Sequence, residues 1–389
     1  MPGIVVRPRA RIFHGHDWVY SSEVLKTFGN PASGDIISLK DGRDRSLGSA
    51  IYNSKSQIVA RRFSRRKQPL DLDFFVRRIS QAVAARQKLD ALRNPGRLVW
   101  SESDGLPGVI IDRYGSHVVL QTLTLGMDLR KGLICDAVRH LFSPASIVER
   151  NDVPIRKAEG MELVSGILHG SAPPELEIQV AGLRFQIQPL TGQKTGFYLD
   201  QCENYCEVAR LSHGLDVLDC FSNQGAFGLA CARSGAKSVT AVEINGDLVR
   251  AIEENARRNN VHLTAIAANV FDYLTSLLER EARFDLVILD PPSFAKTKDA
   301  LGSAWRGYKE IHLRALQLLS PEGILVTFSC SHHVSRAMFL EMIVQASVDA
   351  KRLLRILKCL SQPLDHPILP HLPETEYLKG FILQALPGR

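Results

Sequence analysis

The second half of the chain constrains the fold most, because apolar strand-like segments alternate there with helical ones. The strand-like segments lie at 215–221, 238–244, 263–270, 283–292 and 323–330. Helical segments separate them, which requires crossover connections and a parallel sheet with helices on its faces. The last two segments, 353–360 and 376–386, have no long helix between them. We therefore expect an α/β, Rossmann-like sheet of seven strands, mostly parallel, with an antiparallel edge pair.

Two smaller regions precede this sheet. Short strand-like runs at 3–6, 35–40, 46–52 and 57–63, broken by glycine and proline, predict a β-rich domain up to residue 70. Asp71 is suited to cap a helix that runs to about residue 93, and strands, a helix near 128–141 and a hairpin-like segment follow. The pattern predicts three domains: a β-rich domain at 1–70, a central α+β domain at 71–188 and the large sheet at 189–389.

The positive charge is concentrated in the first domain. Residues 1–70 hold 13 Lys and Arg against 5 Asp and Glu, a surplus of 8, whereas the whole chain has a net charge of +7. The surplus ends in RRFSRRK (61–67), which contains Arg61, Arg62, Arg65 and Arg66. Clustered cations beside an aromatic residue suit an RNA phosphate backbone. A solvated basic linker is the alternative interpretation.

The bulk composition excludes several classes of protein. With 45% hydrophobic and 23% charged residues, the chain is typical of a folded soluble protein. No apolar run approaches the ~20 residues that span a bilayer, and the first residues lack a signal-peptide core. We expect a cytoplasmic protein with no membrane partner. The 7 cysteines are scattered and odd in number, which predicts free thiols.

The strand ends predict a cofactor site, because doubly wound sheets bind ligands beyond the carboxyl ends of their strands. The first end, LDCFSNQGAFG (218–228), lacks the G-x-G-x-x-G fingerprint, which argues against NAD. Gly225 supplies a tight turn, and Asp219 is an acid available to a cationic ligand. S-adenosylmethionine, with a sulfonium and an ammonium and no phosphate, fits both. Glu243 ends the second strand, where a carboxylate binds ribose hydroxyls in many such folds.

The third and fourth strands also end in polar residues. Asn269 has two interpretations of equal weight, as a reader of the adenine edge or as the cap of the next helix. In LDPPSF (289–294), Asp290 precedes Pro291 and Pro292, which remove two N–H donors and stiffen the turn. Phe294 is placed to pack against a planar substrate. Such a turn after a fourth parallel strand favours a class I methyltransferase.

Six motifs occur in an order that resembles a known family. They are RIFHGHDWVYSSEV (11–24), ESDGLPGVIIDRYG (102–115), GQKTGFYLDQ (192–201), LDCFSNQGAFG (218–228), LDPPSFAK (289–296) and FSCS (328–331). Together they resemble the large-subunit ribosomal RNA cytosine-C5 methyltransferase I family over nearly the whole chain. The resemblance implies an RNA-binding PUA domain, a central domain of two strands, a helix and two strands, and a class I methyltransferase domain. It also implies S-adenosylmethionine as cofactor, 23S ribosomal RNA as partner and a homodimer.

The resemblance assigns roles to residues and leaves two departures. Cofactor-binding residues would be Lys194, Phe197, Tyr198, Asp219, Asn223, Gly225, Glu243, Asn269 and Asp290. Substrate-binding residues would be Pro291, Pro292, Phe294, Lys296 and the four arginines of 61–66. Lys194 and Lys296 could equally meet an RNA phosphate or be solvated. The departures are Cys202, where the family usually has Arg, and Ala226, where a second Gly is common.

Cys330, in FSCSHHV (328–334), has three interpretations. Cysteine is often a buried filler. A metal site with His332 and His333 would lack a second cluster to complete it, so we expect no metal. Addition of a thiolate to cytosine C6 would activate C5 for methylation, and the resemblance implies this nucleophilic role. Asp290 would then hydrogen-bond the cytosine at N3 or N4.

Two alternative functions stay open from the sequence. Methylation of an exocyclic base nitrogen uses the same fold without a cysteine, but typically with Asn-Pro-Pro at the fourth strand end. A non-catalytic RNA-binding assembly factor would keep the basic domain and a vestigial pocket. The presence of both Asp290 and Cys330 favours 5-methylcytosine as the product.

Overall fold

The computed structural model describes residues 1–295, 297 and 299–387, which form two compact units. The first unit contains residues 1–178, 186–199 and 363–375, and the second contains residues 179–185, 200–362 and 376–389. The short segments 186–199 and 363–375 therefore belong to the first unit although they follow residues of the second unit in the sequence. The predicted domain boundaries at residues 70 and 188 stay a prediction.

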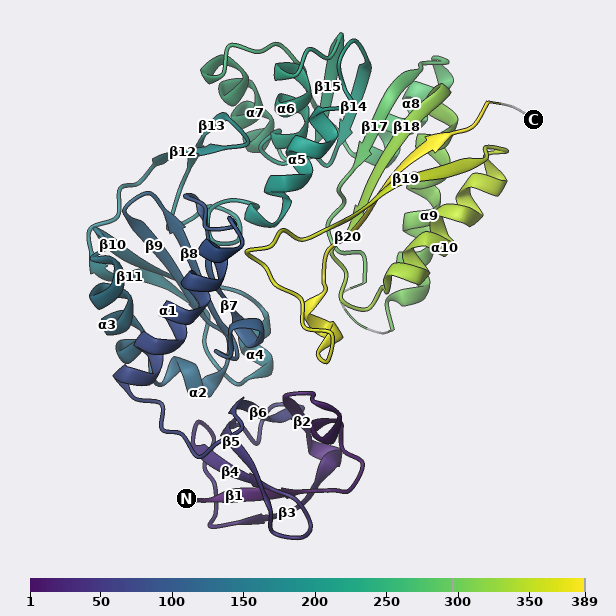
Figure 1. Cartoon of the computed structure of the whole chain (residues 1–389). Coiled ribbons are helices and arrows are strands. Elements are labelled where there is room, and N and C mark those ends of the chain that lie inside the picture. The colour runs from purple at the N-terminus through teal and green to yellow at the C-terminus, as the bar shows by residue number, and fades with distance from the viewer. Residues whose placement is uncertain (296, 298, 388–389) are drawn as a thin grey trace. The chain divides into compact units, whose positions relative to one another are not determined.

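The first unit begins with a six-stranded sheet in the order β2-β6-β5-β4-β1-β3 (Figure 1). Its strands are β1 (Gly3–Val6), β2 (Trp18–Tyr20), β3 (Val24–Phe28), β4 (Ile36–Lys40), β5 (Ser46–Tyr52) and β6 (Ile58–Ser64). Four of them match predicted strands. The other two, β2 and β3, lack a sequence signal, because β2 has three residues and the residues of β3 are half-buried or exposed.

Helix α1 (Leu72–Lys88) follows and begins as predicted. The Asp71 carboxylate accepts a hydrogen bond of 2.8 Å from the Phe74 N–H, which satisfies one of the donors at the helix start. The helix ends about five residues earlier than predicted. Asp90 has a left-handed backbone with φ of 52°, and Pro95 follows soon after, so the chain cannot continue as a helix there.

A five-stranded sheet in the order β11-β10-β9-β8-β7 packs against α1 and α3 (Lys131–Phe142). Its strands are β7 (Gly96–Trp100), β8 (Val109–Tyr114), β9 (His117–Thr122), β10 (Ser146–Asn151) and β11 (Val164–Gly170). Two one-turn helices, α2 (Leu125–Asp128) and α4 (Ile155–Ala158), join these elements. The predicted hairpin is present as β12 (Leu176–Val180) and β13 (Leu183–Ile187).

The second unit is built on a seven-stranded sheet in the order β16-β15-β14-β17-β18-β20-β19. Its strands are β14 (Asp216–Cys220), β15 (Ser238–Glu243), β16 (Thr264–Ala267), β17 (Phe284–Leu289), β18 (Leu319–Ser329), β19 (Leu354–Ser361) and β20 (Lys379–Ala385). The first five in this order are parallel, and β20 is antiparallel to both of its neighbours. The predicted fold class, including the antiparallel edge, is confirmed.

Six helices accompany this sheet (Figure 1). They are α5 (Cys202–Ala209), α6 (Ala226–Arg233), α7 (Gly246–Arg258), α8 (Val270–Glu279), α9 (Leu301–Leu318) and α10 (Arg336–Asp349). Right-handed crossovers place α6 and α7 on one face and α8 and α9 on the other. Apolar residues of α8, α9 and α10 join those of β14, β17 and β18 in one core. Within the described residues, no helix is both long and apolar enough to span a bilayer.

Candidate active site

The strand order places a switch point between β14 and β17. From β14 the chain runs outward through β15 and β16, then returns to β17 on the other side of β14. At such a point the loops that follow the two strands run in opposite directions, which leaves a crevice at the carboxyl ends of the strands. The loop after β14 and the Asp290 turn after β17 border this position.

The loop after β14 has an unusual backbone. Phe221, Asn223 and Gly225 all have positive φ angles, of 61°, 51° and 82°. Left-handed conformations are rare for a bulky residue such as phenylalanine and concentrate at ligand sites. A side chain at Gly225 would also place its Cβ 3.0 Å from Ile252 Cγ2, so the tight turn needs glycine at this position.

Asp219 is the buried acid of this crevice, with 1% of its surface exposed. The Gly228 N–H donates to Asp219 Oδ2 at 2.9 Å, whereas Oδ1 has no hydrogen-bond partner among the described residues. Burial raises the pKa of Asp219 to about 7, and the charges of Asp290 and Glu243 also raise it against the effect of the Gly228 N–H. A buried carboxyl with an unpartnered oxygen beside two other acids fits a cationic ligand.

Glu243 and Asn269 end the next two strands, and both bond to backbone groups. Glu243 Oε2 accepts from the Asn223 N–H at 3.0 Å, which ties the end of β15 to the loop after β14. Asn269 Oδ1 accepts from the Phe271 N–H at 2.9 Å and caps α8. The cap interpretation of Asn269 is thus confirmed. The predicted adenine contact would have to use its amide N–H groups.

Asp290 follows β17 and has a partner that the sequence did not suggest. Gln201 Nε2 donates to Asp290 Oδ2 at 3.1 Å, and Asn204 Nδ2 donates to Gln201 Oε1 at 2.6 Å. Gln201 and Asn204 are both buried, so this chain of bonds fixes the carboxylate. Gln201 is the last residue of the motif GQKTGFYLDQ, which was the only signal for it.

The Asp290 turn and the Cys330 turn lie next to each other. The hydroxyl groups of Ser293 and Ser331 are 2.9 Å apart, and the Tyr308 hydroxyl is 2.9 Å from that of Ser329. Cys330 is partly exposed directly after the last residue of β18. The structure therefore brings together the two turns that carry the predicted catalytic residues.

The cysteines differ in how far burial suppresses ionisation. Burial raises the pKa of Cys231 to about 12 and that of Cys135 to about 11, and it raises the pKa of Cys220 well above its usual value. These thiols stay protonated and packed at neutral pH, as the filler interpretation requires. Cys330 stands among hydroxyl groups and beside Lys379, an environment unlike theirs.

Three residues of the proposed substrate side follow Asp290. Pro291 is buried and Pro292 is exposed. The Phe294 ring lies 4.7 Å from that of Tyr308, between ring centroids, and 6.5 Å from that of Phe221. Phe294 thus belongs to an aromatic cluster that is only partly covered. Lys296 lies outside the described residues.

Three predicted cofactor residues belong to the first unit. The Lys194 ammonium lies 4.1 Å from the centroid of the Tyr198 ring, the Tyr198 hydroxyl donates to Gln193 Oε1, and Phe197 is buried. Their cofactor role stays a prediction. Of the two departures from the resemblance, Cys202 is buried in α5 and Ala226 is the first residue of α6.

The arginine run of β6 divides into two kinds of residue. Arg61 donates to Glu102 Oε1 at 2.8 Å and lies 4.8 Å over the Trp18 ring, and Arg62 donates to Asp17. Burial would raise the pKa of Glu102, but Arg61 lowers it below its usual range. These two arginines stabilise the fold. Arg65 and Arg66 are exposed.

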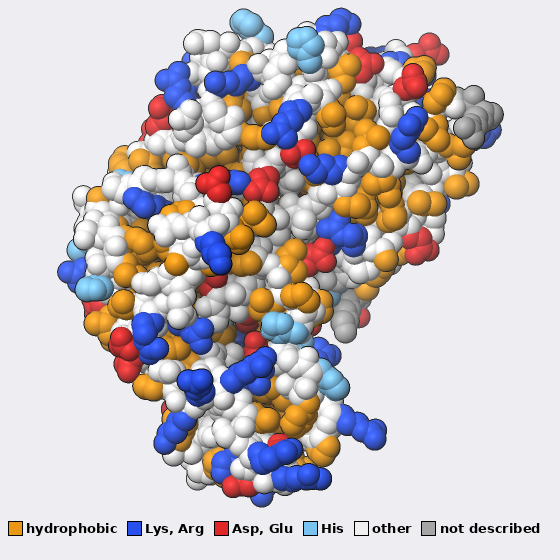
Figure 2. Space-filling view, viewed as in Figure 1, with side chains coloured by type: hydrophobic (Ala, Val, Ile, Leu, Met, Phe, Trp, Pro, Cys, Tyr) orange, Lys and Arg blue, Asp and Glu red, His pale blue; other side chains and the backbone are white. Residues whose placement is uncertain are grey.

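The exposed arginines line a cavity of about 460 Å³ between β6 and α1. Arg77 and Arg78 of α1 line it too, and the sequence prediction missed them because they lie on a helix outside the charged run. Burial, followed by the charge of Arg77, lowers the pKa of Arg78. In the space-filling view, Lys and Arg side chains are frequent over the N-terminal sheet (Figure 2).

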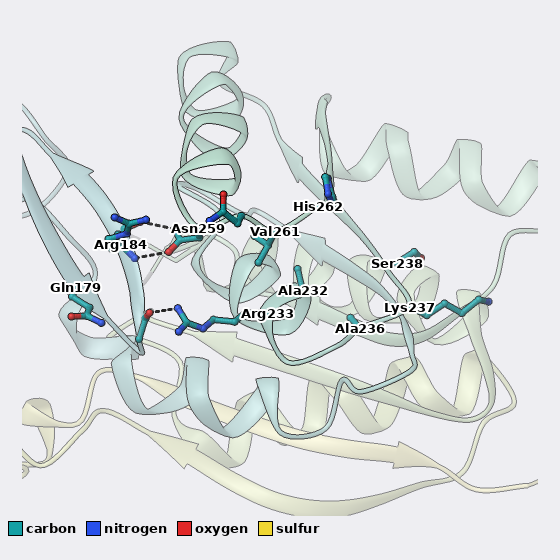
Figure 3. A pocket seen from close by; sticks show the side chains of 12 residues that line it. Gln179, Arg184, Ala232, Arg233, Ala236, Lys237, Ser238, Asn259, Val261 and His262 are labelled. Atoms are coloured by element: carbon teal, nitrogen blue, oxygen red, sulfur yellow. Dashed lines mark hydrogen bonds between the residues drawn. The ribbon is translucent and has the colours of Figure 1, made fainter.

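A second basic groove, of about 730 Å³, lies at the opposite edge of the seven-stranded sheet (Figure 3). Arg184 donates to the Arg258 carbonyl at 2.6 Å, at the end of α7, and Arg233 lies in the last turn of α6. Cations near the C-terminus of a helix bind carbonyls that have no partner within the helix, and they interact favourably with the negative end of the helix dipole. Arg184 therefore has a structural role, and so does Arg233, which donates to the Gly182 carbonyl.

The chain resembles known proteins over nearly its whole length. Residues 7–65 match the PUA-like domain, and residues 161–373 match the S-adenosylmethionine-dependent methyltransferase family. It is 38% identical to "Ribosomal RNA large subunit methyltransferase I" of Aeromonas salmonicida over 379 residues, which cover 95% of each chain. The protein of the same name from Vibrio cholerae is 37% identical over 381 residues, 95% of this chain and 96% of the relative.

Two solved structures share the fold at 22% sequence identity. One is a methyltransferase complexed with SAH, with a TM-score of 0.86. The other is a SAM-dependent methyltransferase from Streptococcus mutans, with a TM-score of 0.84. Each covers 99% of this chain and is itself covered completely.

Proposed function

We propose that this chain, which belongs to the ribosomal RNA large subunit methyltransferase I family, forms 5-methylcytosine in 23S ribosomal RNA through a covalent adduct at Cys330. The predicted cofactor, S-adenosylmethionine, is confirmed by the family to which the chain belongs. The names of the relatives support the proposed substrate. The residues at the strand ends support the proposed product.

The chain's residues suit the cofactor. The unpartnered Oδ1 of Asp219 would accept from its ammonium, and Glu243 would bind its ribose hydroxyls. The mutual repulsion of Asp219, Glu243 and Asp290 would be relieved by a cation. The cofactor supplies an electrophilic methyl group on its sulfonium.

The proposed reaction needs a nucleophile because cytosine C5 alone is unreactive towards that methyl group. The Cys330 thiolate would add to C6, which raises the electron density at C5. Asp290 would hydrogen-bond the base at N3 or N4 and hold a proton at N3 while C6 is attacked. After methyl transfer, loss of the C5 proton and departure of the thiolate would release the enzyme.

The bond between Ser293 and Ser331 is the observation that supports this proposal most. It joins the turn of Asp290 to the turn of Cys330, so an acid and a partly exposed thiol stand on neighbouring turns of one sheet edge. Methylation of an exocyclic nitrogen needs only the acid turn. A non-catalytic RNA-binding protein with a vestigial cofactor pocket would need neither Asp290 nor Cys330 at the crevice.

The basic cavity between β6 and α1 supports RNA as the substrate. Arg65, Arg66, Arg77 and Arg78 line it, and all four would meet phosphate groups. Arg61 and Arg62 are also proposed to bind substrate. Arg62 is buried, Arg61 is partly buried, and both form ion pairs, so they would act by holding β6 in place. The homodimer implied by the resemblance stays a prediction for gel filtration.

The test is to incubate the protein with S-adenosylmethionine and unmodified 23S ribosomal RNA, and to identify the product nucleoside by mass spectrometry. A single 5-methylcytidine is expected. Methylation of N4 would replace the proposed chemistry with the exocyclic alternative. If S-adenosylmethionine did not bind in calorimetry, a non-catalytic RNA-binding role would take its place.

A covalent trap tests the thiol itself. In RNA with 5-fluorocytosine, the C5 position carries no proton to lose after methyl transfer, so the adduct persists. We expect an RNA–protein band on a denaturing gel that requires the cofactor. Cys330→Ala should form no such band, and Cys359→Ala, which alters an exposed thiol, is the matched control.

A further inference from the structure

Lys379 is a buried lysine at the same sheet edge as Cys330. It is the first residue of β20, opposite Ser329 of β18 and Ser361 of β19, and only 2% of it is exposed. Its Nζ donates to the Ser331 carbonyl at 2.7 Å. Lysine is almost never fully buried unless a partner balances its charge, so this position needs a reason.

A carboxylate does not provide that balance. Within the described part of the chain, no acidic group lies within ion-pair distance of Lys379, and the nearby Glu376 binds Arg336 at 2.8 Å. Burial lowers the pKa of Lys379 to about 8, and the charges that raise it again are those of Cys330 and Glu376. Cys330 is the first of these two charges, so an ionised Cys330 would stabilise the buried ammonium of Lys379.

Several other described side chains lie at the same sheet edge as Cys330 and Lys379. His332 and His333 follow it on the same turn, and desolvation, then Lys379 and His333, lower the pKa of His332. From α9, the Tyr308 hydroxyl faces Ser329 and Ser331, and burial raises its pKa, so it stays neutral. Arg336 of α10 is held by Glu376. Lys379 is the cation whose hydrogen bond ends one residue from Cys330.

We propose that Lys379 is a positioning residue that holds Cys330 as a thiolate before the base binds. A neighbouring ammonium lowers the pKa of a thiol, and the thiolate is the reactive form. The thiol proton leaves to solvent, while Lys379 keeps its own proton and forms no covalent bond. The bond from Nζ to the Ser331 carbonyl fixes the distance between the two charges. This inference rests on the proposed role of Cys330.

The test measures the thiol without methyl transfer. The rate of iodoacetamide modification of Cys330 is followed from pH 5 to 10 by mass spectrometry of its peptide, with no RNA or cofactor present. In the wild type we expect an inflection below the ordinary thiol pKa of ~8.5. In Lys379→Met we expect the inflection to rise by at least about one unit, with modification about tenfold slower at pH 7.

Three controls separate charge from structure. Lys379→Arg keeps the charge and should keep the low inflection. Lys309→Met removes a lysine of α9 that pairs with Asp349, and should leave Cys330 unchanged. The exposed Cys359 in each sample is an internal reference for reagent strength.

A wild-type inflection at or above about 8.5 would overturn the proposal without any variant. An unchanged inflection in a folded Lys379→Met protein would also overturn it. The outcome is independent of the proposed function: if Cys330→Ala still methylates RNA, the covalent mechanism fails even where Lys379 is shown to lower the pKa of Cys330.

Discussion

The arginine run of β6 and the strand ends of the seven-stranded sheet both concentrate charge, but they arrange it in opposite ways. Arg61 and Arg62 meet carboxylates of other segments, so that opposite charges pair and stabilise the first unit. At the strand ends, burial raises the pKa of Asp219, and the like charges of Asp290 and Glu243 raise it further. Paired charges indicate a structural role, whereas like charges kept together indicate a site for an oppositely charged ligand.

The same distinction applies inside the first unit. Burial, followed by the charge of the adjacent Arg77, lowers the pKa of Arg78, and both residues line the cavity that Arg65 and Arg66 also line. Here too, charges of one sign lie close together, but they are positive, whereas those at the strand ends are negative. It suits a polyanion, as the acidic crevice suits a sulfonium and an ammonium.

The largest effect expected is that of Cys330→Ala on methyl transfer. Removing a covalent nucleophile typically costs ~10⁴-fold or more in kcat. Binding of S-adenosylmethionine, measured by calorimetry, should be unchanged, because the acids of the crevice remain. A variant with near wild-type kcat would remove the thiol from the mechanism and leave only the acidic crevice as a site.

Arg61→Ala should lower stability rather than RNA binding alone. It leaves Glu102, whose side chain is only 8% exposed, without its ion-pair partner, which typically costs about 3 kcal/mol or more. Urea denaturation measures the free energy of unfolding. Arg65→Ala is the matched control, with an expected change within about 0.5 kcal/mol because the residue is exposed. If both variants lost the same free energy of unfolding, the distinction between the ion-paired Arg61 and the exposed Arg65 would be wrong.

Asp219→Asn should weaken cofactor binding by roughly tenfold to a hundredfold, the usual range for a hydrogen bond to a charged group. Cofactor affinity of the wild type should rise with pH through about 7, as Asp219 ionises, and that of the variant should not. Calorimetry between pH 5.5 and 8.5 measures both. A wild-type affinity that did not change with pH would show that Asp219 does not face the ammonium.

Asp219 should also affect stability without the cofactor. Its folded pKa of about 7 lies above the usual 3.8, so the native state holds the proton more tightly. The stability from this group is complete below pH 3.8 and is lost as the pH rises to about 7. Asp219→Asn should lack this decline. The free energies of unfolding of both proteins, measured at pH 4 and pH 7.5, test whether stability falls with rising pH in the wild type and not in the variant.

The smallest effect expected is that of reversing the exposed arginines. Arg65→Glu with Arg66→Glu should weaken RNA binding about tenfold and reduce the slope of log affinity against log salt by about 2. Arg77→Glu alone should reduce it by about 1. Filter binding at several salt concentrations measures the slope. An unchanged slope would make the cavity between β6 and α1 an ordinary solvated surface.

The sequence alone determined the parallel sheet and the residues at its strand ends. A helix between successive strands forces a parallel arrangement, and parallel strands end at one edge, so Asp219, Glu243, Asp290 and Cys330 were bound to share that edge. Short or exposed strands such as β2 and β3 lack this signal. Local patterns also marked Asp71 as a helix cap, because capping involves only neighbours in the chain.

Only the tertiary structure decided which partner each charged side chain has. Gln201 reaches Asp290 across 89 positions, Glu102 reaches Arg61 across 41, and Lys379 reaches Ser331 across 48. Such pairs depend on how strands and helices pack after the chain has turned back many times. The pattern of residue types along the chain therefore located the acids and the thiol. Long-range packing decided which charges have a partner within the protein and which are left for a ligand to bind.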